Sequence, residues 1–117
     1  MIRKTTHEMK LQPAPFEKIR SGGKTIELRL YDEKRQKIKV GDRIVFTNTE
    51  SGKELWVTVV KLHRFDTFAQ LYQTLDLLQC GYTPEDVDKA CPEDMEDYYS
   101  KEEQAKYGVV GLEILRD

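Results

Sequence analysis

The sequence lacks the long apolar run of about 20 residues that a membrane-spanning helix requires. Its first residues, Met1 to Glu8, contain no apolar segment of the signal-peptide kind, so we expect a cytoplasmic protein with no membrane partner. It has 2 cysteines, Cys80 and Cys91, too few for a disulfide framework and typical of free thiols in a reducing compartment. The short paired spacing of zinc ligands is missing, and we expect no metal and no cofactor.

A glycine-rich nucleotide-binding loop is also missing. The segment Gly22-Gly23-Lys24-Thr25 has the ending of such a loop but lacks its earlier glycine. It also leads into a predicted strand, whereas a phosphate-binding loop opens a helix. The sequence therefore offers no support for a nucleoside-triphosphate enzyme.

Charge is abundant and unevenly distributed, with 34% charged residues and a net charge of −2. Residues 1–64 contain 15 lysines and arginines against 8 acidic residues, a balance of +7. Residues 65–117 contain 4 against 13, a balance of −9. A basic first half can attract phosphate groups, although two solvated faces of opposite sign would explain the same division.

The hydrophobic pattern predicts a single domain over residues 1–117, large enough to bury a core without disulfides or metals. The predicted strands cover residues 7–11, 24–31, 43–48, 54–63 and 109–115, and the predicted helices begin near Pro15, Asp66 or Thr67, Thr83 and Ser100. Most neighbouring strands are joined by hairpins. This order predicts an α+β fold, a small and mostly antiparallel β-barrel with short helices packed at one side.

The strand from Lys24 to Tyr31 concentrates the candidate functional side chains. On a regular strand Glu27 and Arg29 share a face, with Thr25 and Tyr31 beside them. Lys24 has the opposite parity and converges with Glu27 only if the preceding glycine turn bends the start of the strand. A carboxylate and a guanidinium so placed can pair or frame a polar ligand, but an edge strand with a solvated charged face would show the same pattern.

This strand carries a recognisable motif, G-x-K-T-I-E-L-R from Gly22 to Arg29, followed about a dozen residues later by the turn Val40-Gly41-Asp42. Together with residues 60–64 and 107–114, these segments resemble the ASCH domain family over most of the chain. The resemblance implies a fold related to the PUA domains, which are RNA-binding modules. Such a fold has a small β-barrel and a cleft beside the strand that bears the motif.

In the family, the lysine, glutamate and arginine of the motif line the cleft, and they map onto Lys24, Glu27 and Arg29. The resemblance implies that the protein binds RNA. Some bacterial members are amidohydrolases that remove the acetyl group from acetylated cytidine, and others have been linked to ribonuclease activity. The amidohydrolases use a lysine, a threonine and a distant glutamate. Lys24 matches the lysine, Glu27 stands where the threonine is expected, and Thr25 is adjacent to that position.

Two functions therefore stay open for this strand. In an RNA- or modified-nucleoside-binding module, Lys24 and Arg29 would contact phosphate, and Glu27 would accept hydrogen bonds from an exocyclic amine or a sugar hydroxyl. In a small hydrolase, Lys24 and Glu27 would form the acid–base pair. The predicted ligand-binding set is Lys24, Thr25, Glu27, Arg29, Tyr31, Arg35 and Lys39, of which the last two belong to a basic turn.

Residues outside this strand give further expectations. The acidic helical segment 85–103 offers a third function, the docking of a basic protein partner. Asp42 is predicted to be a turn residue that bonds backbone amides. Trp56 is predicted to lie in the core, with a position at the rim, where it could stack a base, as the alternative. The tyrosines of the helical region are predicted to have packing roles, because stacking bases beside many carboxylates is electrostatically unfavourable; they are Tyr98, Tyr99 and Tyr107.

Overall fold

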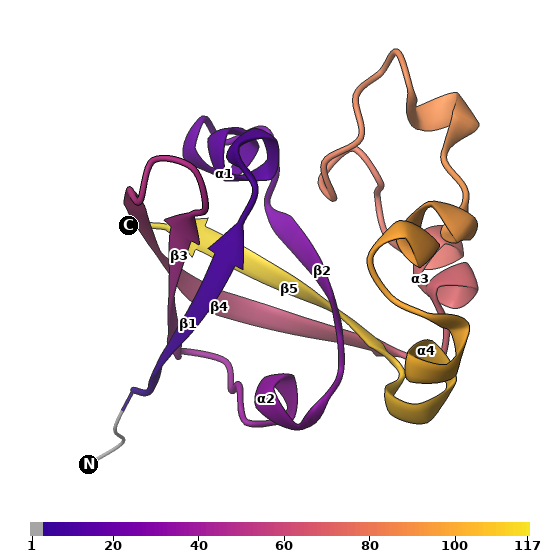
Figure 1. Ribbon diagram of the computed structural model, residues 1–117, viewed down its shortest axis with the longest axis horizontal. Coiled ribbons are helices and arrows are strands. Elements are labelled where there is room, and N and C mark those ends of the chain that lie inside the picture. Colours follow the sequence, from indigo (N-terminus) through magenta and orange to yellow (C-terminus); the bar gives the residue numbers. More distant parts are fainter. Residues whose placement is uncertain (1–3) are drawn as a thin grey trace.

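The computed structural model describes residues 4–117 as an α+β fold with one curled sheet and several short helices (Figure 1). Its strands are β1 (Thr6–Leu11), β2 (Ile26–Leu30), β3 (Arg43–Asn48), β4 (Glu54–Phe65) and β5 (Val109–Arg116). Its helices are α1 (Pro13–Arg20), α2 (Glu33–Gln36), α3 (Phe68–Thr74) and α4 (Lys101–Tyr107), with two 3-10 helices, η1 (Val87–Lys89) and η2 (Pro92–Asp97). Within residues 4–117, no helix has the length and apolar character needed to cross a membrane.

The strands follow the order β1-β3-β4-β5-β2, so that β1 and β2 are the two edges of the sheet. β1 runs parallel to β3, and the remaining three pairings are antiparallel. The sheet curls into a partial barrel, with α1 at one end and α2 at the other, while α3, α4 and the segment between them lie beside β2 (Figure 1). The predicted barrel with short helices at one side is therefore confirmed.

The two faces of the curled sheet bury separate hydrophobic clusters. Apolar side chains from β1, α1, β3, β4 and β5 fill the barrel, with Phe46 and Leu112 among the fully buried ones. On the opposite face, β2 and the start of β5 pack against the helical region through residues such as Phe68 and Leu71. β2 is thus buried on both faces, which is why its charged side chains are withdrawn from bulk solvent.

A β-bulge in β4 changes which of its side chains face the barrel. The pairing register with β5 shifts between Val59 and Lys61, so one extra residue is accommodated there. Before the bulge Val59 lies in the barrel core, whereas after it Leu62 packs against the same core. Arg64 has the same parity as Leu62 and therefore also shares the barrel-facing side.

The turn before β3 is held by Asp42, as the sequence predicts. Its carboxylate accepts hydrogen bonds from the backbone N–H groups of Lys39 and Thr5, at 3.0 and 3.3 Å. It also pairs with Nε2 of His7 at 2.9 Å in a buried contact between the turn and β1. Burial raises the pKa of Asp42, but these hydrogen bonds outweigh burial and hold the pKa below its ordinary value.

The prediction that Trp56 lies in the core is wrong. Its side chain points away from the barrel interior. Val57, the next residue of β4, faces the interior, and successive residues of a strand alternate between faces. Trp56 is 37% exposed on the outer face, and the guanidinium of Arg43 covers its ring at 4.7 Å from the centroid.

The α-helix predicted to start at Thr83 is also absent from the structure, which has turns and the 3-10 helix η1 in this region. The backbone N–H of Thr83 bonds to the carboxylate of Asp86, and its carbonyl accepts from Asp86 and Val87. The chain then turns into Cys91 and Pro92, and proline restricts the preceding residue to extended conformations, which limits helix extension. The capping box at Ser100 does begin α4 as predicted, with Glu103 as its partner.

Candidate functional site

The side chains of Lys24, Glu27 and Arg29 converge around the Glu27 carboxylate. Nζ of Lys24 lies 2.6 Å from Oε1, and the Arg29 guanidinium lies 2.8 Å from Oε2. The three side chains are 10%, 6% and 14% exposed, respectively, so this is a buried charge cluster. Lys24 reaches Glu27 because it precedes the regular strand, and its backbone N–H bonds to the Lys18 carbonyl in the turn after α1.

The two cations determine the charge state of Glu27. Burial raises the pKa of the Glu27 carboxyl, but the adjacent Lys24 ammonium and Arg29 guanidinium outweigh burial and hold the pKa below its ordinary value. Glu27 is therefore ionised at neutral pH, and the cluster carries one net positive charge. Such a cluster attracts anionic groups and also keeps carboxylate lone pairs available as acceptors.

The loop after α3 fixes the start of β2. The carbonyl of Gln79 accepts a hydrogen bond from the backbone N–H of Thr25 at 2.9 Å. Gly81 has φ +110°, and a Cβ atom at this position would lie 3.2 Å from Cδ of Lys24. The carbonyl of Gly81 accepts from Nζ of Lys18 at 2.8 Å. The absence of a Cβ at Gly81 therefore leaves room for the Lys24 side chain beside this loop.

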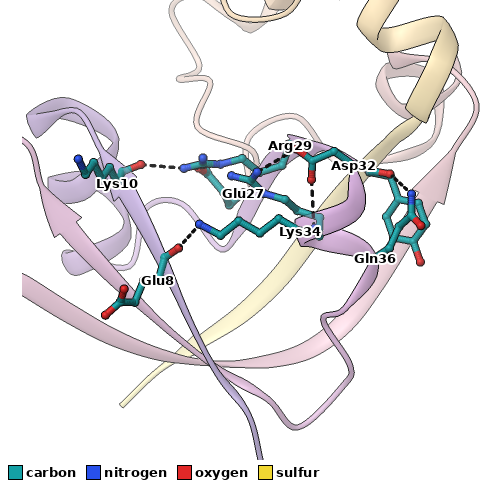
Figure 2. A network of polar contacts seen from close by, with 9 residues as sticks. Glu8, Lys10, Glu27, Arg29, Asp32, Lys34 and Gln36 are labelled. Carbon is teal, nitrogen blue, oxygen red and sulfur yellow. Dashed lines mark hydrogen bonds and ion pairs between the residues drawn. The ribbon is translucent and has the colours of Figure 1, made fainter.

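Arg29 also bridges the gap between the two edges of the sheet. Figure 2 shows its guanidinium reaching the backbone carbonyl of Lys10 in β1, at 2.9 Å, while Lys34 reaches the carbonyl of Glu8 at 2.6 Å. Within residues 4–117, β1 pairs with β3 alone, so these carbonyls belong to its free edge. Two cationic side chains thus provide the hydrogen bonds that a neighbouring strand would otherwise give.

A cavity of about 600 Å³ opens beside this cluster, within the range of ~300–1,000 Å³ that small-molecule sites occupy. Lys24, Glu27 and Arg29 line the cavity, and the exposed side chains of Lys10 and Lys18 belong to its basic wall. The opposite wall comes from the helical region and consists mainly of tyrosine and aspartate side chains: Tyr72, Tyr82, Asp86, Asp94, Asp97, Tyr98 and Tyr99.

A chain of hydrogen bonds holds the tyrosine wall. The hydroxyls of Tyr72 and Tyr82 lie 2.7 Å apart, and the Tyr82 hydroxyl donates to Oδ2 of Asp94 at 2.7 Å. Burial raises the pKa of Tyr72 to about 12, and burial with these hydrogen bonds raises the pKa of Tyr82. The hydrogen bond from Tyr82 and those from Cys91 hold the pKa of Asp94 below its ordinary value. Tyr72 and Tyr82 therefore contribute neutral phenols to the wall, and the ionised Asp94 carboxylate accepts the hydrogen bond from Tyr82.

The remaining predicted site residues lie outside this cavity lining. Thr25 is bound to the loop after α3, and Tyr31 lines a second cavity at the other end of β2. Arg35 is held by Asp32 at 3.1 Å, and Lys39 is exposed in the turn before β3. Ligand binding by these residues stays a prediction.

Sequence reasoning missed the tyrosine wall. Tyr98 was expected to pack, but it is 71% exposed and lines the cavity. Tyr99 does pack, stacking on Phe68 with 6.3 Å between ring centroids, and it also lines the cavity. The available signal was the concentration of five of the 6 tyrosines between residues 72 and 107. Judging that region by its net charge hid the aromatic surface that these rings present beside the aspartates.

The acidic segment 85–103 contributes part of this wall through Asp86, Asp94 and Asp97. Within residues 85–103, Tyr98 alone is an exposed large hydrophobic side chain. The segment thus lacks the contiguous apolar patch that would favour a protein-docking surface.

The fold and the placement of the motif beside the barrel define a PUA-like protein. The ASCH domain family model matches residues 9–116, and the chain belongs to this family, whose PUA-like fold is associated with RNA binding. Among curated proteins, none matches the chain.

Solved structures of similar proteins have the same fold. The crystal structure of the hypothetical protein PH0355 has a TM-score of 0.79 at 36% identity, covering 97% of this chain and 100% of that chain. The solution structure of protein PF0455 from Pyrococcus furiosus has a TM-score of 0.73 at 34% identity, covering 96% of this chain and 97% of that chain. The crystal structure of a mutant ASCH protein from Zymomonas mobilis has a TM-score of 0.66 at 14% identity, covering 98% of this chain and 70% of that chain. At this identity the two proteins share the fold alone.

Proposed function

We propose that the protein binds single-stranded RNA and takes one unpaired nucleoside into the cavity. The observation that carries this proposal is that the buried Lys24–Glu27–Arg29 cluster lines the same cavity as a wall of tyrosine and aspartate side chains. Single-stranded RNA is commonly recognised by bases that stack on aromatic rings and by polar groups that read their edges. The cavity combines both kinds of group in a space of nucleoside size.

Each wall has a defined part in this proposal. The exposed ammonium groups of Lys10 and Lys18 contact the phosphates that flank the bound nucleoside. Tyr98 offers an exposed ring on which a base can stack. Glu27 uses one lone pair on each oxygen for its two cations, so the remaining lone pairs accept from a sugar hydroxyl or an exocyclic amine.

Hydrolysis is the second candidate, and the 2.6 Å contact between Lys24 and Glu27 is the observation that favours it. The pKa of Glu27 argues in the other direction. An effective general base has a pKa near the working pH, whereas the two cations lower the pKa of Glu27. Binding is therefore the better account of this cluster.

The test of binding is fluorescence anisotropy with labelled single-stranded RNA of mixed sequence, at two salt concentrations. We expect binding to weaken with salt, because displaced counterions accompany every phosphate contact. Lys24→Gln should lower the affinity about tenfold or more, since a charged hydrogen bond is lost. The matched control is Lys61→Ala, which removes an exposed lysine outside the cavity. Binding that does not depend on salt, or an equal loss of affinity in Lys24→Gln and Lys61→Ala, would contradict the proposal.

A chromatographic assay separates the second candidate from the first. Acetylated cytidine and a panel of modified nucleosides are incubated with the wild-type protein and with Lys24→Gln. Turnover that disappears in the variant would establish a hydrolase. RNA binding without turnover is the result expected here.

A further inference from the structure

A second cavity, of about 520 Å³, lies at the opposite end of β2 from Lys24. Its lining includes two cationic side chains and two tyrosines: Tyr31, Arg64, Lys106 and Tyr107. The guanidinium of Arg64 lies over the Tyr31 ring at 4.3 Å from its centroid, and Nζ of Lys106 lies over the Tyr107 ring at 5.0 Å. Two cation–aromatic pairs therefore border the same hollow.

The position of Tyr31 is fixed by the backbone on both sides. Its N–H donates to the carbonyl of Gly108 at 3.0 Å, and its carbonyl accepts from the side-chain amide of Gln36 at 2.9 Å. Gly108 has φ +71°, and a Cβ atom there would lie 3.0 Å from the carbonyl oxygen of Phe65. This close turn brings the end of α4 beside the end of β2. The cavity is thus a built feature of the fold.

The charges of this cavity are available to a ligand. Across the described residues 4–117, neither Arg64 nor Lys106 forms an ion pair, and both side chains are exposed. Asp66 is the acidic residue of the lining, so the lining keeps one net positive charge. The Arg64 guanidinium lies over the Tyr31 ring in an exposed side chain, and a guanidinium plane is a surface on which an RNA base can stack.

The second cavity lies one short strand away from the first. β2 spans the 5 residues from Ile26 to Leu30, and Tyr31 follows directly after its end. Tyr31 lies two residues beyond Arg29, a distance of about 7 Å along a strand. Both cavities are therefore within reach of one short single-stranded RNA.

We infer that Arg64 and Tyr31 form a second RNA contact, a stacking platform for a base that follows or precedes the nucleoside in the first cavity. Lys106 contacts a phosphate beside it. The inference rests on the proposed function, because it assigns a further subsite to the same single-stranded RNA. It also gives Tyr31, which lies outside the first cavity, a ligand-binding role of its own.

The test compares fluorescein-labelled mixed-sequence RNAs of about three and about eight nucleotides, the longer lying within the ~4–16 nucleotides that one OB fold, a barrel domain of similar size, covers. Arg64→Ala should weaken binding of the longer RNA about tenfold and leave the affinity for the shorter RNA unchanged. Arg64→Lys keeps the positive charge but lacks the flat guanidinium, so its affinity for the longer RNA should fall nearly as far as that of Arg64→Ala. Tyr31→Leu, which removes the ring but keeps an apolar side chain at the barrel, should show the same length dependence. Lys61→Ala is the control for charge loss alone and should affect neither RNA.

The outcomes separate the inference from the proposed function. If the wild-type protein binds neither RNA, both fail. If it binds both RNAs with affinities that Arg64→Ala leaves unchanged, the second contact is refuted while the proposed function stands. Full affinity in Arg64→Lys would refute stacking, because a positive charge alone would then suffice. Circular dichroism of each variant verifies that it is folded before its affinity is compared.

Discussion

The guanidinium of Arg29 donates a hydrogen bond to the backbone carbonyl of Lys10, at 2.9 Å, across the gap between the two edges of the sheet. The same guanidinium pairs with Glu27 at 2.8 Å. One side chain therefore connects the candidate site to the closure of the barrel. Any change at Arg29 should alter both the stability of the fold and the shape of the cavity.

Arg29→Ala should lower the free energy of unfolding by about 3 kcal/mol, because it leaves a buried carboxylate with one cation and frees an edge carbonyl of β1. Arg29→Lys should lower the free energy of unfolding by less, since an ammonium can still pair with Glu27. Urea unfolding followed by circular dichroism measures both. Arg20→Ala is the control, because Arg20 pairs with Glu17 in an exposed ion pair on α1, and its removal should leave the urea midpoint unchanged. Equal midpoints for Arg29→Ala and wild type would contradict the bridging role.

The stability of the protein should fall in acid. The pKa values of Glu27 and Asp42 are lower in the folded protein than in the unfolded chain, where carboxyl groups titrate near about 4. The unfolded state consequently binds more protons as the pH drops, so the stabilisation is complete above the unfolded pKa and is lost as the pH falls through the folded pKa. Urea midpoints measured from about pH 7 to about pH 3 should decrease.

A variant identifies the source of this pH dependence. Asp42→Asn keeps an acceptor oxygen for the backbone N–H of Lys39 but does not titrate. It should be less stable than wild type at neutral pH and lose less stability on acidification. A variant curve parallel to that of wild type would exclude Asp42 as a source.

Much of the fold could be predicted because local signals agree with the final packing. The predicted strand 43–48 coincides with β3, and the capping box at Ser100 begins α4. The K-x-x-E-x-R motif also identified Lys24, Glu27 and Arg29, which meet as a cluster. In these cases residues close together in the sequence determine the structure, so sequence patterns were sufficient.

The rest depends on contacts that sequence periodicity does not encode. A strict alternation along β4 places His63 on the face of Val59, whereas the bulge between Val59 and Lys61 brings Arg64 to that face instead. The loop carbonyl of Gln79 that fixes the start of β2 comes from a segment more than fifty residues away. The bonds from Arg29 and Lys34 to the edge of β1 likewise depend on how the sheet curls.

The tyrosine wall should behave as a connected unit. Tyr82→Phe removes the hydroxyl that donates to Asp94 and pairs with Tyr72, leaving both partners short of a hydrogen bond. It should lower the free energy of unfolding by about 1–2 kcal/mol. Tyr98→Phe removes a hydroxyl from a side chain that is 71% exposed and should leave the urea midpoint unchanged. Similar midpoints for the two variants would show that the hydrogen-bond chain does not stabilise the wall.

Gly81→Ala should weaken RNA binding several-fold, because the added Cβ would lie 3.2 Å from Cδ of Lys24 and make this side chain shift beside Glu27. Gly41→Ala is a closely matched control: Gly41 has φ +95° against +110° for Gly81, and an added Cβ there meets nothing within 4 Å. Both variants should lose about 1–2 kcal/mol of stability from backbone strain. Anisotropy titrations at a temperature where both variants are folded then separate the two effects. Equal affinities would mean that contact with Gly81 does not position Lys24 for binding.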